Sequence, residues 1–347
     1  MELDSLSSNR IDERKMNQIE NYLSFFKQKT EELEIKVYKD QLDILKKINI
    51  NKSKISCSPE EKVTFYRGQQ SLYLSKNSSN LFSIVPSLMH NKEVEKNEYE
   101  VFQDLLRLDP DAFLNQKSYL DIHKEMQHYS EISRVIDITT QALTGLFFAV
   151  GELTKKSETD PYVFMFSVGR LNVKRPESDG TQIKLALSTI KDNQREELRE
   201  SIELYKIKKK FVRNRNKLKF EFNEKECVKK LVYSVRKNDG VLESIDVPED
   251  IKDTEFVLPT MNNKRIVAQQ GAFIAVGLLN DEEIYNNLLE FMTIPILNTV
   301  MMIKIKKEYA YEVKLELEQL GISKAVMYPD INKIGQYFKA DFYSRKN

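Results

Sequence analysis

The part of the chain that we expect to fold opens with Val63-Thr64-Phe65-Tyr66-Arg67-Gly68-Gln69. Its β-branched and aromatic residues predict a buried strand that ends at Arg67 and Gly68. An arginine can hold a phosphate through two parallel hydrogen bonds, and a glycine lets a ligand come close to the backbone. A surface ion pair at Arg67 is the alternative. The segment therefore predicts a strand that ends either at an anion-binding arginine or at a structural one.

A second cluster of unusual residues lies just before the most apolar segment of the chain. It begins at Gln127, His128 and Tyr129, continues through Arg134 and Asp137, and is followed by Ala142–Val150. The apolar segment is predicted to be a buried helix. Burying an arginine and an aspartate beside it is costly unless they pair with each other or contact a ligand. The sequence leaves both explanations open.

A third cluster, late in the chain, combines Arg265, Gln269 and Gln270 with a glycine. The neighbouring apolar residues predict short strands at Ile266–Val267 and Phe273–Val276, with turns around them. Glutamine can both donate to and accept from a sugar or an amide. This cluster predicts either a ligand contact or a polar hairpin.

Helices and short strands follow one another irregularly in the rest of the chain. Strands are predicted at Tyr162–Val168 and Val300–Ile305, and helices at Glu95–Arg107, Glu282–Phe291 and Glu308–Leu320. The regular alternation of a doubly wound sheet is absent. The predicted fold class is therefore α+β.

The overall composition narrows the class of protein. The 347 residues carry 54 basic and 53 acidic side chains, so any attraction to nucleic acid or lipid must be local. The two cysteines, Cys57 and Cys227, are far apart, which predicts a reducing compartment. The first ten residues lack the features of a signal peptide, and the apolar runs are about half as long as a membrane span. We expect a soluble, cytoplasmic protein without a membrane partner.

Several well-known catalytic motifs are missing. The sequence contains no glycine-rich dinucleotide motif, no P-loop, no nucleophile elbow and no HExxH zinc motif. Two of the three histidines, His123 and His128, are five residues apart and would lie on different faces of a helix. We therefore predict no metal site.

The first 60 residues are predicted to form a helical extension and a linker. Residues 11–50 contain neither Gly nor Pro and place apolar residues at helical spacing, whereas residues 51–60 have the composition of a linker. The helix either packs against the main domain or docks onto a protein partner, for example as a coiled coil.

Local positive charge is concentrated in long charged helices predicted within residues 190–237. Between Tyr205 and Phe220 the chain has eight basic residues and no acidic one. Such a stretch can bind RNA or DNA through counterion release, or it can pair with the acidic stretches on both sides of it. The candidate nucleic-acid contacts are Lys208, Lys209, Lys210, Arg213 and Arg215.

Taken together, the clusters resemble the FRG domain family. The Tyr-Arg-Gly start, the QHY…R..D.T block and the RI..Q.G.F block occur in the order of that family. The resemblance covers about residues 61–340, with a charged helical insertion around 190–237, and leaves residues 1–60 outside. Ser130 stands where the family usually has Gly, which alters the turn before Arg134.

By analogy, the Tyr-Arg-Gly strand is similar to the first core strand of arginine-type ADP-ribosyltransferases. This similarity implies a split mixed sheet with peripheral helices, to which the N-terminal helical extension is added, and it implies NAD as cofactor. Arg67 would hold the pyrophosphate, Tyr129 would stack near nicotinamide and Gln270 would contact the ribose. The implied catalytic residues are Gln270, Tyr129 and Asp137, and the implied cofactor-binding residues are Tyr66, Arg67, Gly68, Gln69, His128 and Arg134.

One departure from those enzymes bears on the chemistry. Gln269 and Gln270 stand where they carry a glutamate. A carboxylate stabilises the positive charge that develops when the glycosidic bond of NAD breaks, whereas an amide supplies only a dipole. Transfer would need another carboxylate, and the candidates are Glu131, Asp137 and Glu255.

Two functions follow as expectations. The first is an ADP-ribosyltransferase-like protein of a bacterial toxin or phage-defence setting, which uses NAD to modify a macromolecule, with RNA or DNA as a candidate acceptor. The second is a non-catalytic nucleotide or nucleic-acid binding module that signals through its N-terminal helix.

Overall fold

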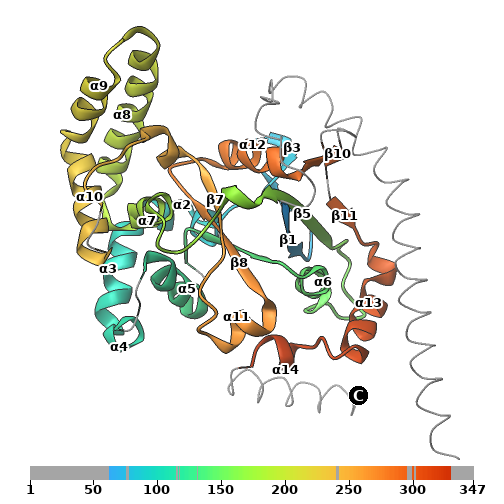
Figure 1. Cartoon of the computed structure of the whole chain (residues 1–347). Coiled ribbons are helices and arrows are strands. Elements are labelled where there is room, and N and C mark those ends of the chain that lie inside the picture. Colours follow the sequence, from blue (N-terminus) through green and yellow to red (C-terminus); the bar gives the residue numbers. More distant parts are fainter. Residues whose placement is uncertain are drawn as a thin grey trace, which may run out of the picture.

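The fold is that of a computed structural model of the chain (Figure 1). It describes residues 62–75, 78–114, 116, 118–130, 132–239, 242–294, 299–300 and 302–329. The predicted helix at 11–50 and the linker at 51–60 lie outside the described residues.

A curled, mixed sheet of seven strands forms the centre of the described structure (Figure 1). The strand order is β11-β5-β1-β4-β8-β7-β6, and all neighbours are antiparallel except β7 and β6, which are parallel. The prediction of an α+β fold with a mixed sheet is confirmed. The strands are β1 (Lys62–Gln69), β4 (Val135–Thr139), β5 (Tyr162–Gly169), β6 (Val173–Lys174), β7 (Thr254–Val257), β8 (Gly271–Val276) and β11 (Met302–Lys304).

Helices and two short hairpins surround this sheet. The hairpins pair β2 (Leu74–Ser75) with β3 (Ser78–Phe82), and β9 (Thr293–Ile294) with β10 (Thr299–Val300). The α-helices are α2 (Lys92–Lys96), α3 (Glu98–Leu108), α4 (Pro110–Phe113), α5 (Tyr119–Ser130), α6 (Ala142–Val150), α7 (Asp179–Leu185), α8 (Asp192–Phe211), α9 (Arg215–Asn223), α10 (Glu226–Asp239), α11 (Lys264–Gln269), α12 (Asp281–Met292), α13 (Lys307–Gln319) and α14 (Lys324–Met327).

Most predicted elements occur where the sequence places them, with one clear exception. The apolar segment Ala142–Val150 is helix α6, and the charged segment 190–237 contains α8, α9 and α10. The predicted strand at Ile266–Val267 is wrong, because both residues lie in helix α11. The Asn263 side chain accepts a hydrogen bond from the Arg265 backbone N–H at 2.7 Å and caps the helix start.

The sheet is divided between β1 and β4. Strand β1 pairs along its whole length with β5, and β4 pairs along its whole length with β8. Between β1 and β4, which are both fully described, one residue pair is in register, Tyr66 with Thr139. The two halves of the sheet therefore meet at this pair and separate beyond it.

The two faces of the sheet bury different cores. Phe65, Phe256 and Ile274 belong to a core that also includes residues of α12. Tyr66 points to the other face, where it packs against a cluster formed by α6 and α13. Strand alternation thus decides which side chains of β1 and β4 share a face.

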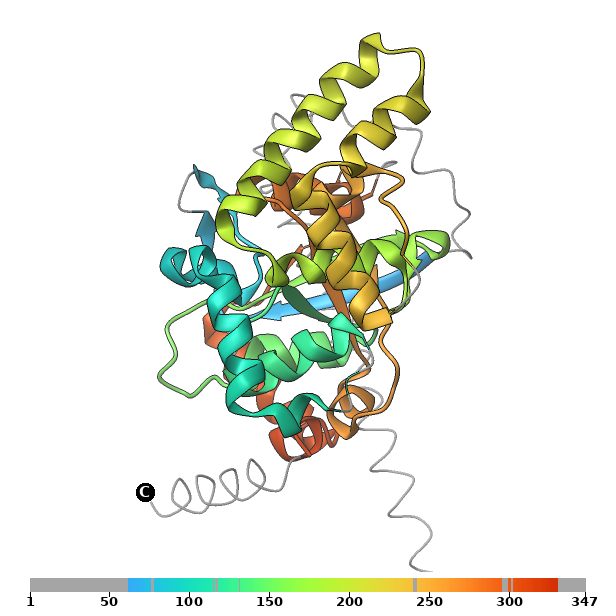
Figure 2. The same cartoon turned by 90° about the vertical axis from the view of Figure 1, so that its left-hand side faces the viewer.

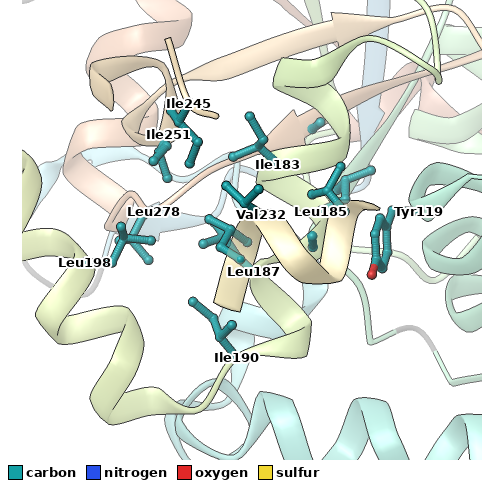
Figure 3. Close-up of a cluster of buried hydrophobic side chains, with 14 of the residues drawn as sticks. Tyr119, Ile183, Leu185, Leu187, Ile190, Leu198, Val232, Ile245, Ile251 and Leu278 are labelled. Carbon is teal, nitrogen blue, oxygen red and sulfur yellow. The ribbon is translucent and has the colours of Figure 1, made fainter. Parts of the chain in front are cut away.

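A third core anchors the helical insertion that connects β6 to β7. Figure 3 shows part of it, with Leu198 of α8 and Val232 of α10 in one cluster with Ile183, Leu185 and Leu278. Helices α8 and α9 form a hairpin whose far end projects away from the sheet (Figures 1 and 2). The base of the insertion is buried, whereas its tip is a protrusion.

Helix α6 lies so close to β1 that no side chain fits between them at Gly68. A Cβ atom at Gly68 would stand 2.1 Å from the Gly145 carbonyl oxygen and 2.4 Å from the Ala149 nitrogen. A Cβ atom at Gly145 would stand 2.7 Å from the Tyr66 Cβ. The interpretation of Gly68 as a point of close ligand approach is thus corrected: the α6 backbone occupies that space.

We predict that Gly68→Ala destabilises the fold by about 1–3 kcal/mol or more, the usual cost of overpacking a core. Gly271→Ala is the matched control in β8, because its Cβ would meet no atom closer than 3.8 Å. Urea unfolding of both variants measures the difference. Equal stability of the two variants would contradict this account of the β1–α6 contact.

Candidate functional site

A cleft opens on the sheet face that carries α5, α6 and α11. Its floor comes from β4 and β8, and its walls come from the three helices. In Figure 1, α11 lies below β8, with α5 and α6 on its two sides. The lining residues are Lys124, Glu125, Gln127, Asp137, Ile138, Phe148, Asn263, Arg265, Ile266, Gln269, Gly271, Ala272 and Phe273.

Asp137 supplies the carboxylate of the cleft. It lies in the middle of β4, and one of its oxygens, Oδ2, accepts a hydrogen bond from Gln127 Nε2 at 2.7 Å. Burial raises the pKa of Asp137 above its usual value, while the charges of Arg265 and Arg67 oppose this rise. Asp137 is thus a buried carboxylate in the field of two arginines, of which Arg265 lines the same cleft.

Arg265 faces the cleft from the first turn of α11. Its guanidinium carbon lies 5.0 Å from the centre of the Tyr328 ring, a cation–π contact. Among the described residues, no side chain or carbonyl accepts a hydrogen bond from this guanidinium. Arg265 therefore offers donors to an anionic or polar ligand.

Several buried polar atoms near the division of the sheet have no partner among the described residues. They are Gln127 Oε1, Arg67 Nε and Gln69 Oε1. Most buried polar atoms in proteins are hydrogen-bonded, so an unpaired one calls for a reason. Gln127 Oε1 belongs to a cleft-lining residue, which makes a ligand donor the simplest reason at that position.

Arg67 bridges the two halves of the sheet. Its Nη1 donates a hydrogen bond to the Asp137 carbonyl oxygen at 2.7 Å, across the division between β1 and β4. Burial lowers the pKa of Arg67 from its usual value, and the Asp137 carboxylate counteracts this effect. The predicted alternative of a surface ion pair does not describe this contact, since the hydrogen-bond acceptor is a backbone carbonyl. Arg67 is also not among the residues that line the cleft.

The two late glutamines have different positions. Gln269 lines the cleft, and its Nε2 donates to the Met327 carbonyl oxygen at 2.9 Å. Gln270 ends α11 in a left-handed conformation, with φ of 46°, and its side chain donates back to the Val267 carbonyl oxygen at 3.0 Å. The structure thus places Gln269, rather than the predicted Gln270, in the lining of the same cleft as Asp137.

Arg134 belongs to a buried ion network away from the cleft lining. Its Nε and Nη2 donate to the two carboxylate oxygens of Glu98 at 2.5 Å, and its Nη1 donates to the Gly277 carbonyl oxygen at 3.2 Å. Arg195 also pairs with Glu98, at 3.0 Å. An Arg134–Asp137 pair is therefore wrong. The ligand role implied for Arg134 stays untested, but its donors are already used by the protein.

A histidine completes this network. His123 Nε2 lies 2.9 Å from the Leu185 carbonyl oxygen and 3.0 Å from Ser188 Oγ. Burial lowers the pKa of His123 to about 4, so the ring is neutral at pH 7. This residue is a core component.

The three candidate carboxylates have different surroundings. Glu255 forms an ion pair with the buried Lys184 at 2.9 Å and accepts a hydrogen bond from Thr181. Glu131 lies outside the described residues. Asp137 is the candidate that lines the cleft.

Other predicted site residues are placed only in part. His128 and Tyr129 belong to the last turn of α5, and their side chains lie outside the described ones. Tyr66 faces α6. Sequence reasoning missed Lys124 and Asn263 as cleft residues, although the capping pattern at Asn263 was a usable local signal for the start of α11.

The predicted nucleic-acid contacts lie at the far end of the α8–α9 hairpin, away from α11 (Figure 1). Lys208 pairs with Glu221 at 3.8 Å and Lys209 pairs with Glu249 at 2.6 Å. Lys210, Arg213 and Arg215 are exposed and have no ion pair within the described structure. The expected pairing with neighbouring acidic residues therefore applies to part of this basic segment.

Comparison with known families gives a match to one part of the chain. The model of the FRG domain matches residues 62–158, which include β1, β4, α5 and α6. The predicted continuation of the family to residue 340 lies beyond this match. No curated protein and no solved structure matches the chain. Within the described ranges, no helix is both long and apolar enough to cross a bilayer.

We predict that Arg134→Ala destabilises the protein by about 3–5 kcal/mol, because it leaves part of the buried Glu98 charge uncompensated. Arg107→Ala is the control, since its pair with Asp104 is exposed and is expected to contribute less than about 1 kcal/mol. Guanidinium unfolding distinguishes the two variants. Unchanged stability of Arg134→Ala would favour a ligand-binding role instead.

Proposed function

We propose that this protein, whose residues 62–158 form an FRG domain, uses NAD to transfer ADP-ribose to a macromolecule, and that the reaction takes place in the cleft around Asp137. A bacterial toxin or phage-defence setting, which the family resemblance implies, is part of the same proposal.

One observation carries the proposal. Asp137 belongs to the matched family segment and is a desolvated carboxylate, and it lines the same cleft as Arg265, whose donors are free in the described chain. A carboxylate can stabilise positive charge that develops on a ribose when its glycosidic bond breaks. This removes the need for a glutamate at the position of Gln270.

The residues of the cleft fit a nucleotide in part. Gln127 has a buried oxygen without a partner, which suits a hydroxyl or an amide, and Arg265 suits a phosphate. Arg67 fits the predicted pyrophosphate role less well, since its guanidinium already bridges the sheet to Asp137. The cleft has a volume of about 40 Å³, enough for a few water molecules, so nearly all of a dinucleotide would lie outside it.

In the proposed reaction the ligand provides the group to be transferred, and the protein provides charge and orientation. NAD, when bound, would supply the ADP-ribosyl group. Asp137 would supply the negative charge near the ribose, Gln127 would orient Asp137 through its 2.7 Å hydrogen bond, and Arg265 would hold the phosphates. Phe148 lines the same cleft and would exclude water from part of it.

A second candidate is a non-catalytic nucleotide-binding module. It is favoured by the placement of Gln270, whose side chain bonds to its own helix and does not line the cleft. Both candidates predict nucleotide binding, and they differ in whether nicotinamide is released. Incubation with labelled NAD and with cellular RNA, DNA and protein separates transfer, hydrolysis and binding alone.

We predict that Asp137→Asn lowers nicotinamide release on the order of 10²-fold, because an amide lacks the negative charge. Glu282→Gln, an exposed carboxylate on α12, is the control and keeps full activity. Liquid chromatography of released nicotinamide measures both. Full activity of Asp137→Asn would exclude Asp137 as the stabilising carboxylate.

The same variant has an expected effect on stability. The folded-state pKa of Asp137 is raised, so the folded state favours the protonated form, and this contribution is lost as pH rises through the folded pKa. Asp137→Asn should therefore unfold at a higher temperature than the parent protein at pH 7, with the difference shrinking as pH falls through the raised folded pKa and vanishing below about pH 4.

We predict that Arg265→Gln weakens binding of NAD or ADP-ribose on the order of tenfold or more, the effect of losing a charged hydrogen-bond donor. Lys264→Gln removes the same charge from the same helix at an exposed position outside the cleft, and should bind normally. Titration calorimetry compares them. Equal affinities of the two variants would place the nucleotide elsewhere.

A further inference from the structure

The tip of the α8–α9 hairpin presents an unusual surface. It consists of the last residues of α8, the connection at 212–214 and the first turn of α9, here defined as residues 210–217. Figures 1 and 2 both show this end projecting away from the sheet. A ligand bound at the tip would not need access to the cleft.

Half of the tip residues are cations without an ion-pair partner. Lys210, Arg213, Arg215 and Lys217 are all exposed, and none forms an ion pair with another described residue. Further down the hairpin the lysines are paired instead. These pairs are Lys206 with Glu203, Lys208 with Glu221, Lys209 with Glu249 and Lys219 with Asp246, at 3.3, 3.8, 2.6 and 2.8 Å.

The tip also exposes an aromatic ring between two of these cations. Phe211 is 81% exposed and stands directly after Lys210, two residues before Arg213. Within the described structure, its ring has no aromatic or cation–π partner. An exposed phenylalanine set among free cations offers a stacking surface next to anion-binding groups.

We propose that residues 210–217 bind single-stranded nucleic acid, with Phe211 stacking on a base and the four cations contacting phosphates. A repeated phosphate backbone matches four free cations within eight residues, and base stacking on an aromatic ring is independent of sequence. An anionic membrane fits less well, because only Phe211 and Val212 of the tip are apolar. This proposal does not rest on the function proposed for the cleft.

The test measures fluorescence anisotropy of a labelled oligothymidylate and its RNA counterpart with the full chain, over a range of salt concentrations. The tip variant changes Lys210, Arg213, Arg215 and Lys217 to Gln. The control variant changes Lys206, Lys208, Lys209 and Lys219 to Gln, which removes the same charge from the paired lysines of the same hairpin. Thermal unfolding verifies that both variants fold.

We expect the tip variant to reduce the slope of log affinity against log salt by up to about 3, since each lost contact to a single strand removes about 0.7. The control variant should change the slope by less than about 0.7, the contribution of one phosphate contact. Phe211→Ala should weaken binding to single strands on the order of tenfold and binding to duplex much less.

Three results would overturn the proposal. The first is an absence of oligonucleotide binding by the parent chain. The second is an equal loss of slope in the tip and control variants, which would indicate diffuse attraction. The third is Phe211-dependent binding to vesicles of phosphatidylcholine and phosphatidylserine without binding to oligonucleotides, which would assign the tip to a membrane.

Discussion

The backbone contact between Gly68 and helix α6 sets how β1, β4 and α6 are arranged around the cleft. Because only two residues separate the end of β4 from the start of α6, fixing the helix on β1 also fixes the end of β4 beside Tyr66. The two strands then diverge, since β4 is held by β8 and β1 is held by β5. Arg67 reaches across that divergence, and Asp137 faces the cleft. The close contact at Gly68 and Gly145 thus helps to set the positions of the Arg67 and Asp137 side chains.

The other wall of the cleft comes from a distant part of the chain. Helix α11 precedes β8 directly, so the pairing of β8 with β4 carries Arg265 and Gln269 toward Asp137. The hydrogen bond from Gln269 to Met327 then ties this helix to α14. Desolvating a carboxylate here is unfavourable for folding, and nearby arginines offset only part of that cost. Sites that act on ligands commonly retain such local costs.

The sequence predicted the elements whose signals are local. Helix α6 is apolar on all sides, and β5 is bounded by Pro161 and Gly169, so both could be located from composition alone. Helix α11 was misassigned because two adjacent apolar residues suit a strand and a helix equally, and only the Asn263 cap distinguishes them. The partner of Arg134 was beyond prediction, since Glu98 lies 36 residues earlier and nothing local links them. The cleft was identified in part: Asp137 was anticipated, whereas Gln270 points elsewhere.

The position of the helical insertion has an evolutionary consequence. Strands β6 and β7 are parallel neighbours at one edge of the sheet, and a parallel pair needs a crossover between its ends. Residues 175–253 are that crossover, so its entry and exit are adjacent and its base is anchored in its own core. Its outer half can lengthen, shorten or change composition while the strands keep their register. Lineages carrying this architecture could diversify what the hairpin recognises while the cleft stays the same.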